Sequence, residues 1–125
     1  MSIAQAAWEK NAEDPVVIEV KSSSDVTDYL MICSANSTRG VKTIVDNIEK
    51  KLKGMDEKII GIEGHAEGKW VLVDSADVVA HIFYEPLREF YNIESLWIDA
   101  PRVKISFEKQ LLKKTDRYTQ IQAAD

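Results

Sequence analysis

Apolar side chains recur along this chain with two different periods, which predict different elements. Over residues 38–53 they fall three or four positions apart, a spacing that places them on one face of a helix, with charged residues on the other. Residues 29–34 are apolar at odd and even positions alike, which is typical of a central strand. Further strands are predicted at 16–20, 59–63, 69–74 and 77–84, the last two forming a hairpin.

Two shorter helices are predicted on either side of these strands. One covers residues 3–12 and ends before Pro15, because the residue preceding a proline is pushed out of the helical region. Pro86 opens the other, over residues 87–97, with a break expected near Asn92. This order favours an α/β fold: a mixed sheet of about five strands with packed helices, the long helix crossing over between the second and third strands.

The length of 125 residues suits one domain, which we place at residues 1–101. The remaining segment, 102–125, is a C-terminal extension whose structure the pattern leaves open. Its apolar residues first alternate as in a strand and then fall at helical spacing: Val103, Ile105, Phe107, Leu111 and Leu112. From residue 115 onward the polar sequence resembles a frayed end.

Composition narrows the class of protein. Apolar residues make up 45% of the chain and charged residues 30%, values typical of a globular domain. No apolar run is long enough to cross a bilayer, and residues 1–8 lack the basic start and apolar stretch of a secretory signal. Cys33 is the only cysteine, so no internal disulfide can form, and the cytoplasm is the expected compartment.

The net charge of −5 bears on the kind of partner. Proteins that bind nucleic acid displace counterions from phosphates with Lys and Arg, so direct nucleic-acid recognition is not expected. An acidic surface suits a basic protein partner. The same charge also serves simply to keep a small protein in solution, and charge alone does not separate these two roles.

Motifs for catalysis or cofactor binding do not emerge from the residues. No glycine-rich phosphate loop opens a helix. Asp74 and Asp77 stand three positions apart across a tight turn, so turn formation is favoured over a magnesium site, which commonly uses carboxylates two apart on one strand. Both His81 and Cys33 lie within apolar strands; His81 is interpreted as a buried or interface residue and Cys33 as a small core residue. No cofactor, metal ligand or catalytic residue is therefore predicted.

Trp70 and Leu72 are the first candidate binding residues. They share one face of the 69–74 strand, and Val71 and Val73 share the other. If the valines face the covering helices, a Trp–Leu patch lies on the opposite side, and such patches mark protein interfaces. The alternative is that the N-terminal helix or the C-terminal tail covers this face.

Three later residues form a second candidate set. Arg88, Tyr91 and Trp97 recur at multiples of three along the last predicted helix, which would place them on a similar side. Arg, Tyr and Trp are typical interface anchors. They also serve to fix a terminal helix to its own sheet, and for Trp97 this core role is favoured.

The ordered combination of several segments resembles the ribosomal silencing factor family, also called the Iojap family. The matching segments are Thr27–Tyr29 running into Ile32, then 61–64, 70–74, 77–83 and 88–97. Together they extend over roughly residues 12–100, which is most of the chain.

The resemblance implies a protein that is not an enzyme. Members bind protein number fourteen of the large ribosomal subunit and block joining of the small subunit, lowering translation when nutrients are limited. The family fold looks like a nucleotidyltransferase core without its active site. By match to the family segments, Trp70 is the main anchor, with Leu72 beside it; Arg88, Tyr91 and Trp97 are weaker candidates.

Two other classes of function stay open at this point. One is a nucleotide-binding or nucleotidyl-transfer protein, which would require Asp74 and Asp77 to hold a metal ion. The other is a homodimeric module whose Trp70 face is buried against a second copy.

Overall fold

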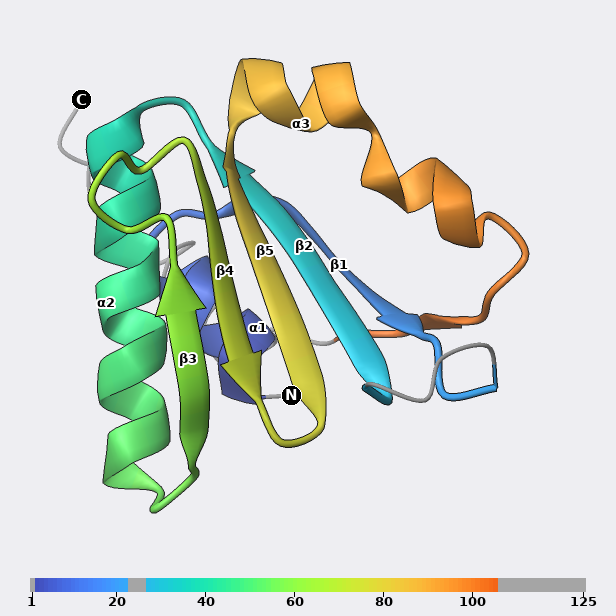
Figure 1. Cartoon of the computed structure of the whole chain (residues 1–125), viewed down its shortest axis with the longest axis horizontal. Coiled ribbons are helices and arrows are strands. Elements are labelled where there is room, and N and C mark those ends of the chain that lie inside the picture. Colours follow the sequence, from blue (N-terminus) through green and yellow to red (C-terminus); the bar gives the residue numbers. More distant parts are fainter. Residues whose placement is uncertain (1, 23–26, 106–125) are drawn as a thin grey trace, which may run out of the picture.

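The computed structural model describes residues 2–22 and 27–105 (Figure 1). Its elements follow in the order α1 (Ser2–Glu9), β1 (Glu13–Glu19), β2 (Tyr29–Ala35), α2 (Thr38–Gly54), β3 (Ile59–Glu63), β4 (Trp70–Ser75), β5 (Val78–Tyr84), α3 (Glu85–Tyr91), the 3-10 helix η1 (Ile93–Trp97) and β6 (Arg102–Val103). The predicted α/β class is confirmed.

The strands form one mixed sheet in the order β3-β4-β5-β2-β1-β6. The central pair, β2 and β5, is parallel, and every other neighbouring pair is antiparallel. The helix α2 connects β2 to β3 at the far edge, past β5 and β4, as a crossover connection requires. The predicted β4–β5 hairpin is present.

The sheet has six strands rather than about five. The additional strand, β6, lies in the segment that the sequence pattern left open, and it pairs with β1 through Val17 opposite Val103. The predictions for residues beyond 105, the helical stripe and the frayed end, fall outside the described residues.

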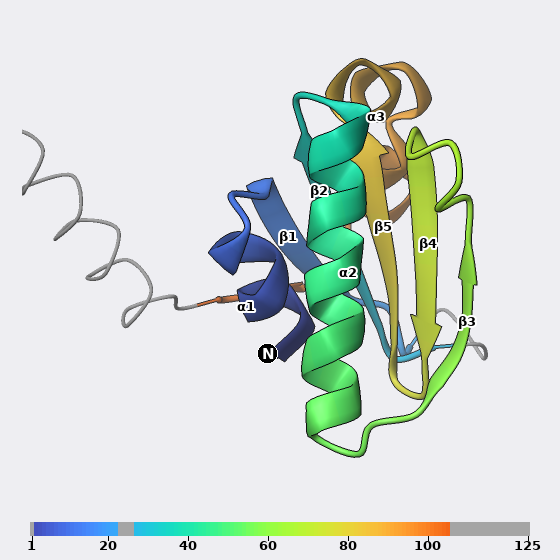
Figure 2. The same ribbon diagram turned by 90° about the vertical axis from the view of Figure 1, so that its left-hand side faces the viewer.

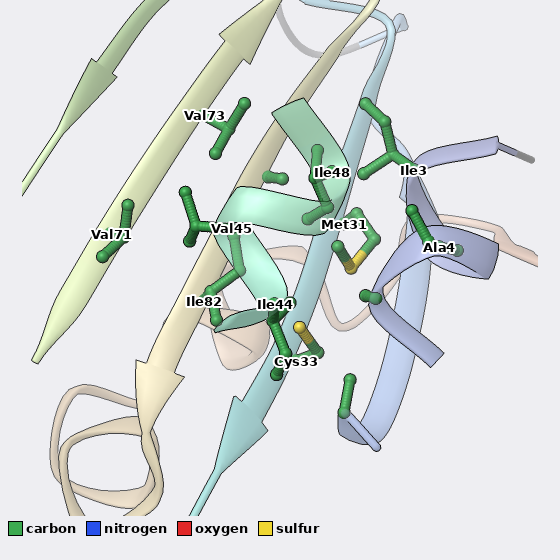
Figure 3. Close-up of a cluster of buried hydrophobic side chains, with 14 of the residues drawn as sticks. Ile3, Ala4, Met31, Cys33, Ile44, Val45, Ile48, Val71, Val73 and Ile82 are labelled. Atoms are coloured by element: carbon green, nitrogen blue, oxygen red, sulfur yellow. The ribbon is translucent and has the colours of Figure 1, made fainter. Parts of the chain in front are cut away.

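Both α1 and α2 lie on the same face of the sheet (Figure 2). Their apolar sides meet the strands in the larger core cluster, where Met31 and Cys33 of β2 contact the layer formed by Ile44 and Ile48 of α2 (Figure 3). Burying this continuous apolar layer is the main stabilisation of the domain. The Asn47 side chain joins the two helices by donating to the Ala6 carbonyl at 2.8 Å.

A smaller core cluster lies on the opposite face of the sheet. It is built from buried residues of β1, β2 and β5: Ile18, Val20, Leu30, Ile32, Val79 and Phe83. Side chains of α3, η1 and the turn after them pack against it, namely Leu87, Ile93, Trp97 and Ala100. Helical segments therefore cover one whole face and part of the other.

Two helix boundaries differ from the prediction. The first helix ends at Glu9 rather than residue 12, because Asn11 takes a left-handed conformation with φ of 65° and turns the chain into β1. The last helical stretch begins one residue before Pro86 and is interrupted at Asn92, where φ is 44° and the backbone is left-handed. The expected break near Asn92 is thus confirmed.

Candidate partner-binding site

The two faces of β4 differ as the alternation of its residues predicts. Val71 and Val73 are fully buried in the larger cluster beneath the helices. Trp70 and Leu72 are half-buried and lie on the opposite face, beside the smaller cluster. The N-terminal helix does not cover this face, because α1 packs on the other side with α2 (Figure 2).

Trp70 belongs to a series of aromatic contacts that runs from the core to the surface. Its ring stacks on buried Phe83 with the centroids 4.8 Å apart, and the Tyr91 ring lies 4.9 Å away at an angle of 40°. Phe90 meets Tyr91 edge-on at 5.0 Å. Exposure rises along this series: Tyr91 is 50% exposed and Phe90 is 77% exposed. We call Trp70, Leu72, Phe90 and Tyr91 the aromatic surface.

His81 holds the indole of Trp70 in place. The two residues lie on the neighbouring strands β4 and β5, and the Trp70 Nε1–H donates to His81 Nδ1 at 3.1 Å. A neutral imidazole with its proton on Nε2 is required for this bond, since Nδ1 must accept. Burial lowers the pKa of His81 to about 4, so the side chain is neutral around pH 7.

The loop before β4 brings backbone close to Trp70. Gly64 has φ of +85°, and a Cβ there would lie only 2.4 Å from the Trp70 carbonyl oxygen, so only glycine suits this position. A shallow hollow lies beside it, lined by Glu63, Gly64, Trp70 and Leu72. The aromatic surface therefore has a concave border with one carboxylate at its rim.

Arg88 turns inward instead of toward solvent, and its side chain is only 12% exposed. Its Nε donates to Glu94 at 2.7 Å, and its Nη2 donates to the Asp14 carbonyl at 2.8 Å. Its Nη1 donates to the Glu13 carbonyl and to Ser34 Oγ, both at 3.1 Å. The guanidinium thus connects α3 and η1 to the first two strands.

The remaining candidate, Trp97, is half-buried against the smaller cluster, the core position favoured from the sequence. Because the helix is interrupted at Asn92, the spacing of Arg88, Tyr91 and Trp97 does not define one continuous helical face. The structure brings Tyr91 to Trp70, whereas Arg88 is bonded within the protein and Trp97 packs against the smaller cluster.

Sequence reasoning missed two members of this site, Phe90 and His81. Phe90 stands next to Tyr91, and an aromatic residue beside a candidate anchor was the signal available in the sequence. His81 was interpreted as a buried or interface residue, and the structure shows it half-buried on β5. Its hydrogen bond to Trp70 depends on the β4–β5 register, which places Leu72 opposite His81.

The structure gives Asp74, Asp77 and Cys33 structural surroundings. Asp74 and Asp77 flank a turn that the Ser75 hydroxyl closes by donating to the Val78 carbonyl at 2.9 Å. Burial raises the pKa of the Cys33 thiol to about 12. Within residues 2–22 and 27–105, no three His, Cys, Asp or Glu side chains come together as a metal site. No helix in this part of the chain has the length and apolar character needed to span a membrane.

The fold and the site define a mixed α/β domain that covers one sheet face with two helices and presents aromatic side chains on the other. The family model described as "Ribosomal silencing factor during starvation" matches residues 1–125. The chain therefore belongs to the ribosomal silencing factor family, as the resemblance of its segments predicted.

Similar proteins agree with this assignment. The ribosomal silencing factor RsfS of Bacillus subtilis is 39% identical over 108 residues, which cover 86% of this chain and 92% of the relative. The mouse protein "Mitochondrial assembly of ribosomal large subunit protein 1" is 35% identical over 71% of this chain and 40% of its own length. A crystal structure from Chromobacterium violaceum superposes with a TM-score of 0.76 at 31% identity, covering 86% and 87% of the two chains.

Family membership gives the chain a ribosome-associated silencing role, and with it a place in the regulation of translation. The family is named for silencing and not for a catalysed reaction.

Proposed function

We propose that this protein binds the large ribosomal subunit through its protein number fourteen and thereby blocks joining of the small subunit. The observation that carries the proposal is Trp70: a half-buried indole with a fixed orientation, on a sheet face that neither α1 nor α2 covers. Support for the ribosome as target comes from the family, whose description also names starvation, the condition under which we expect translation to be lowered. The mouse relative is named for large-subunit assembly, which favours that subunit.

The proposed mechanism is steric and requires no catalysis. A domain bound where the small subunit would dock prevents joining if its binding free energy exceeds that of subunit association. An interface of standard size, about 1,600 Å² in total, reaches nanomolar affinity when it contains well-packed aromatic anchors. Trp70 is held by His81, Phe83 and Tyr91, so little conformational entropy is lost when it packs against a partner.

Charge adds a contribution to the rate of encounter. The chain carries a net charge of −5, and Glu63 lies at the rim of the aromatic surface. Ribosomal proteins are usually basic, so the two surfaces attract each other before contact. Acting on ribosomal subunits, the protein would work in the cytoplasm.

Sedimentation of purified large subunits with this protein tests the proposal. We expect the protein to sediment with the subunits and to reduce the yield of joined ribosomes when small subunits are added. Trp70→Ala should weaken binding by more than about 2 kcal/mol, because an anchor residue is removed from a packed interface. Met55→Ala is the matched control: Met55 is 50% exposed, but it follows α2 on the other face of the sheet.

Three results would contradict the proposal. The first is a folded protein that fails to bind large subunits at low micromolar concentration. The second is unchanged binding by Trp70→Ala, which would remove Trp70 from the site. The third is a dose-dependent rise in melting temperature with ATP or GTP and Mg²⁺ in a protein that does not bind subunits, which would favour nucleotide binding. Light scattering at several concentrations separately shows whether the protein dimerises, as the homodimer alternative requires.

A further inference from the structure

We infer that Arg88 is a positioning residue: it fixes the place of Tyr91 in the aromatic surface and does not itself contact the partner. This inference rests on the proposed function, since it assigns a role within that same surface. Its central observation is that the guanidinium makes four hydrogen bonds inside the protein, to Glu94, Ser34 and the carbonyls of Glu13 and Asp14.

The acceptors of Arg88 are built into an irregularity of β1. The register of β1 against β2 shifts between Glu13 and Val16, which marks a β-bulge, and Asp14 has φ of 46° within it. A residue in the left-handed region turns its carbonyl away from the direction of a regular ladder. Here the carbonyls of Glu13 and Asp14 accept from Arg88, so the bulge has bonding partners on α3.

The position of α3 depends on its tertiary contacts, because little of the helix is buried. It has only seven residues, Glu85–Tyr91, and none of them is fully buried. A helix of this length is not stable by itself and must be held by tertiary contacts. α3 follows β5 directly, Leu87 packs against the smaller cluster, and Arg88 adds hydrogen bonds from α3 to β1 and β2. One turn further along, Tyr91 contacts Trp70 with the ring centroids 4.9 Å apart.

The surroundings of Arg88 argue against direct contact with a partner. The side chain is 12% exposed, and its ion-pair partner Glu94 is 22% exposed. An arginine whose N–H groups are already bonded in a fixed fork geometry has little to offer a second protein. What it does supply is a fixed distance between β1, β2 and α3, and hence a fixed place for Tyr91 beside Trp70.

Arg88→Lys tests this role, because lysine keeps the positive charge but cannot form the same fork of hydrogen bonds. We expect the folded variant to lose nuclear Overhauser contacts between the Tyr91 and Trp70 rings, and to bind large subunits about tenfold more weakly. Arg39→Lys on α2 is the matched control; Arg39 is exposed, and its variant should match the wild type in both measurements.

A double-mutant cycle separates positioning from contact. If Arg88 acts through Tyr91, then Arg88→Lys added to Tyr91→Ala causes no further loss of binding. Additive losses would mean that Arg88 contacts the partner independently and would overturn the inference. So would unchanged ring contacts in Arg88→Lys. If Arg88→Lys does not fold, Ser34→Ala removes one of the acceptors and is measured in the same way, with smaller effects in the same direction expected.

The ring contacts are measured without ribosomes. Loss of those contacts in a protein whose wild type does not bind large subunits would leave the positioning role of Arg88 supported and overturn only the proposed target.

Discussion

At the scale of single residues, the pair formed by Trp70 and His81 links burial to the aromatic surface. The imidazole accepts the indole N–H only while Nδ1 is unprotonated. Burial lowers the pKa of His81 to about 4, well below its usual value of 6.5, and so keeps that acceptor available. A half-buried histidine on β5 therefore holds the orientation of the neighbouring Trp70 on the same face of the sheet.

This arrangement predicts a specific dependence of stability on pH. Because the folded state binds the His81 proton more weakly than the unfolded state, the contribution of His81 is complete above about pH 6.5 and is lost as the pH falls toward 4. The loss should approach about 3 kcal/mol at the lower limit. Urea unfolding of the wild type and of His81→Gln at several pH values in this range measures the loss of stability. The difference between their free energies of unfolding should change with pH. Parallel curves would contradict the prediction.

At the scale of elements, α2 shows how local sequence and packing agree. Its N-cap is Ser37, whose hydroxyl accepts the Gly40 N–H at 2.9 Å, and Lys51 and Lys53 lie in its last turn. The N-cap stabilises the start of the helix, and the two lysines stabilise its end because their positive charges interact favourably with the helix dipole. Five apolar residues on one side of the helix are buried: Val41, Ile44, Val45, Ile48 and Leu52.

Removing the N-cap should therefore lower stability without altering binding. Ser37→Ala is expected to cost about 1 kcal/mol of unfolding free energy, because one N–H of the first turn loses its acceptor. Ser37→Asp keeps an acceptor and is the control. Affinity for large subunits should be unchanged in both variants, since α2 packs on the face opposite Trp70. Weaker binding by folded Ser37→Ala would place part of the interface near the start of α2.

The short helix α3 contrasts with α2. Its position comes from Arg88 and from the bulge of β1, not from a buried stripe. This difference explains why the three-residue spacing of Arg88, Tyr91 and Trp97 did not describe one face. Asn92 interrupts the helix between Tyr91 and Trp97, and tertiary contacts place each side chain separately.

At the scale of the whole molecule, the two faces of the sheet differ in what they carry. One face, covered by α1 and α2, contains the larger core cluster; the other carries the smaller cluster and, beside it, the aromatic surface. The larger core cluster thus lies on the face away from the proposed partner. This separation is the reason to expect that Trp70→Ala remains folded.

The thiol of Cys33 reports on the integrity of that fold. It is fully buried within the larger cluster, and burial raises its pKa to about 12. A thiol reagent at pH 8 should therefore leave the native protein unlabelled and react completely in denaturing urea. Trp70→Ala should be protected equally well, because its change lies on the other face. Rapid labelling of native wild type would show that the larger cluster opens without global unfolding.

Local patterns along the sequence accounted for much of this architecture. Helical spacing predicted α2, and the alternation of β4 separated Val71 and Val73 from Trp70 and Leu72. These predictions succeeded because helix and strand periods place neighbouring residues on defined faces, whatever the rest of the chain does. The family segments extended the prediction to the ribosome-associated role, which motif composition alone did not indicate.

Tertiary structure decided the contacts between distant parts of the chain. Arg88 bonds a carbonyl 75 positions earlier, and Trp70 bonds a histidine on the next strand. The face that α1 covers, the parallel pairing of β2 with β5 and the sixth strand follow likewise from how elements assemble. Sequence periodicity determines which face of an element is apolar, but strand order and register determine what that face meets. For this reason the face on which Trp70 and Leu72 lie was predictable, and the residues that hold Trp70 in place were not.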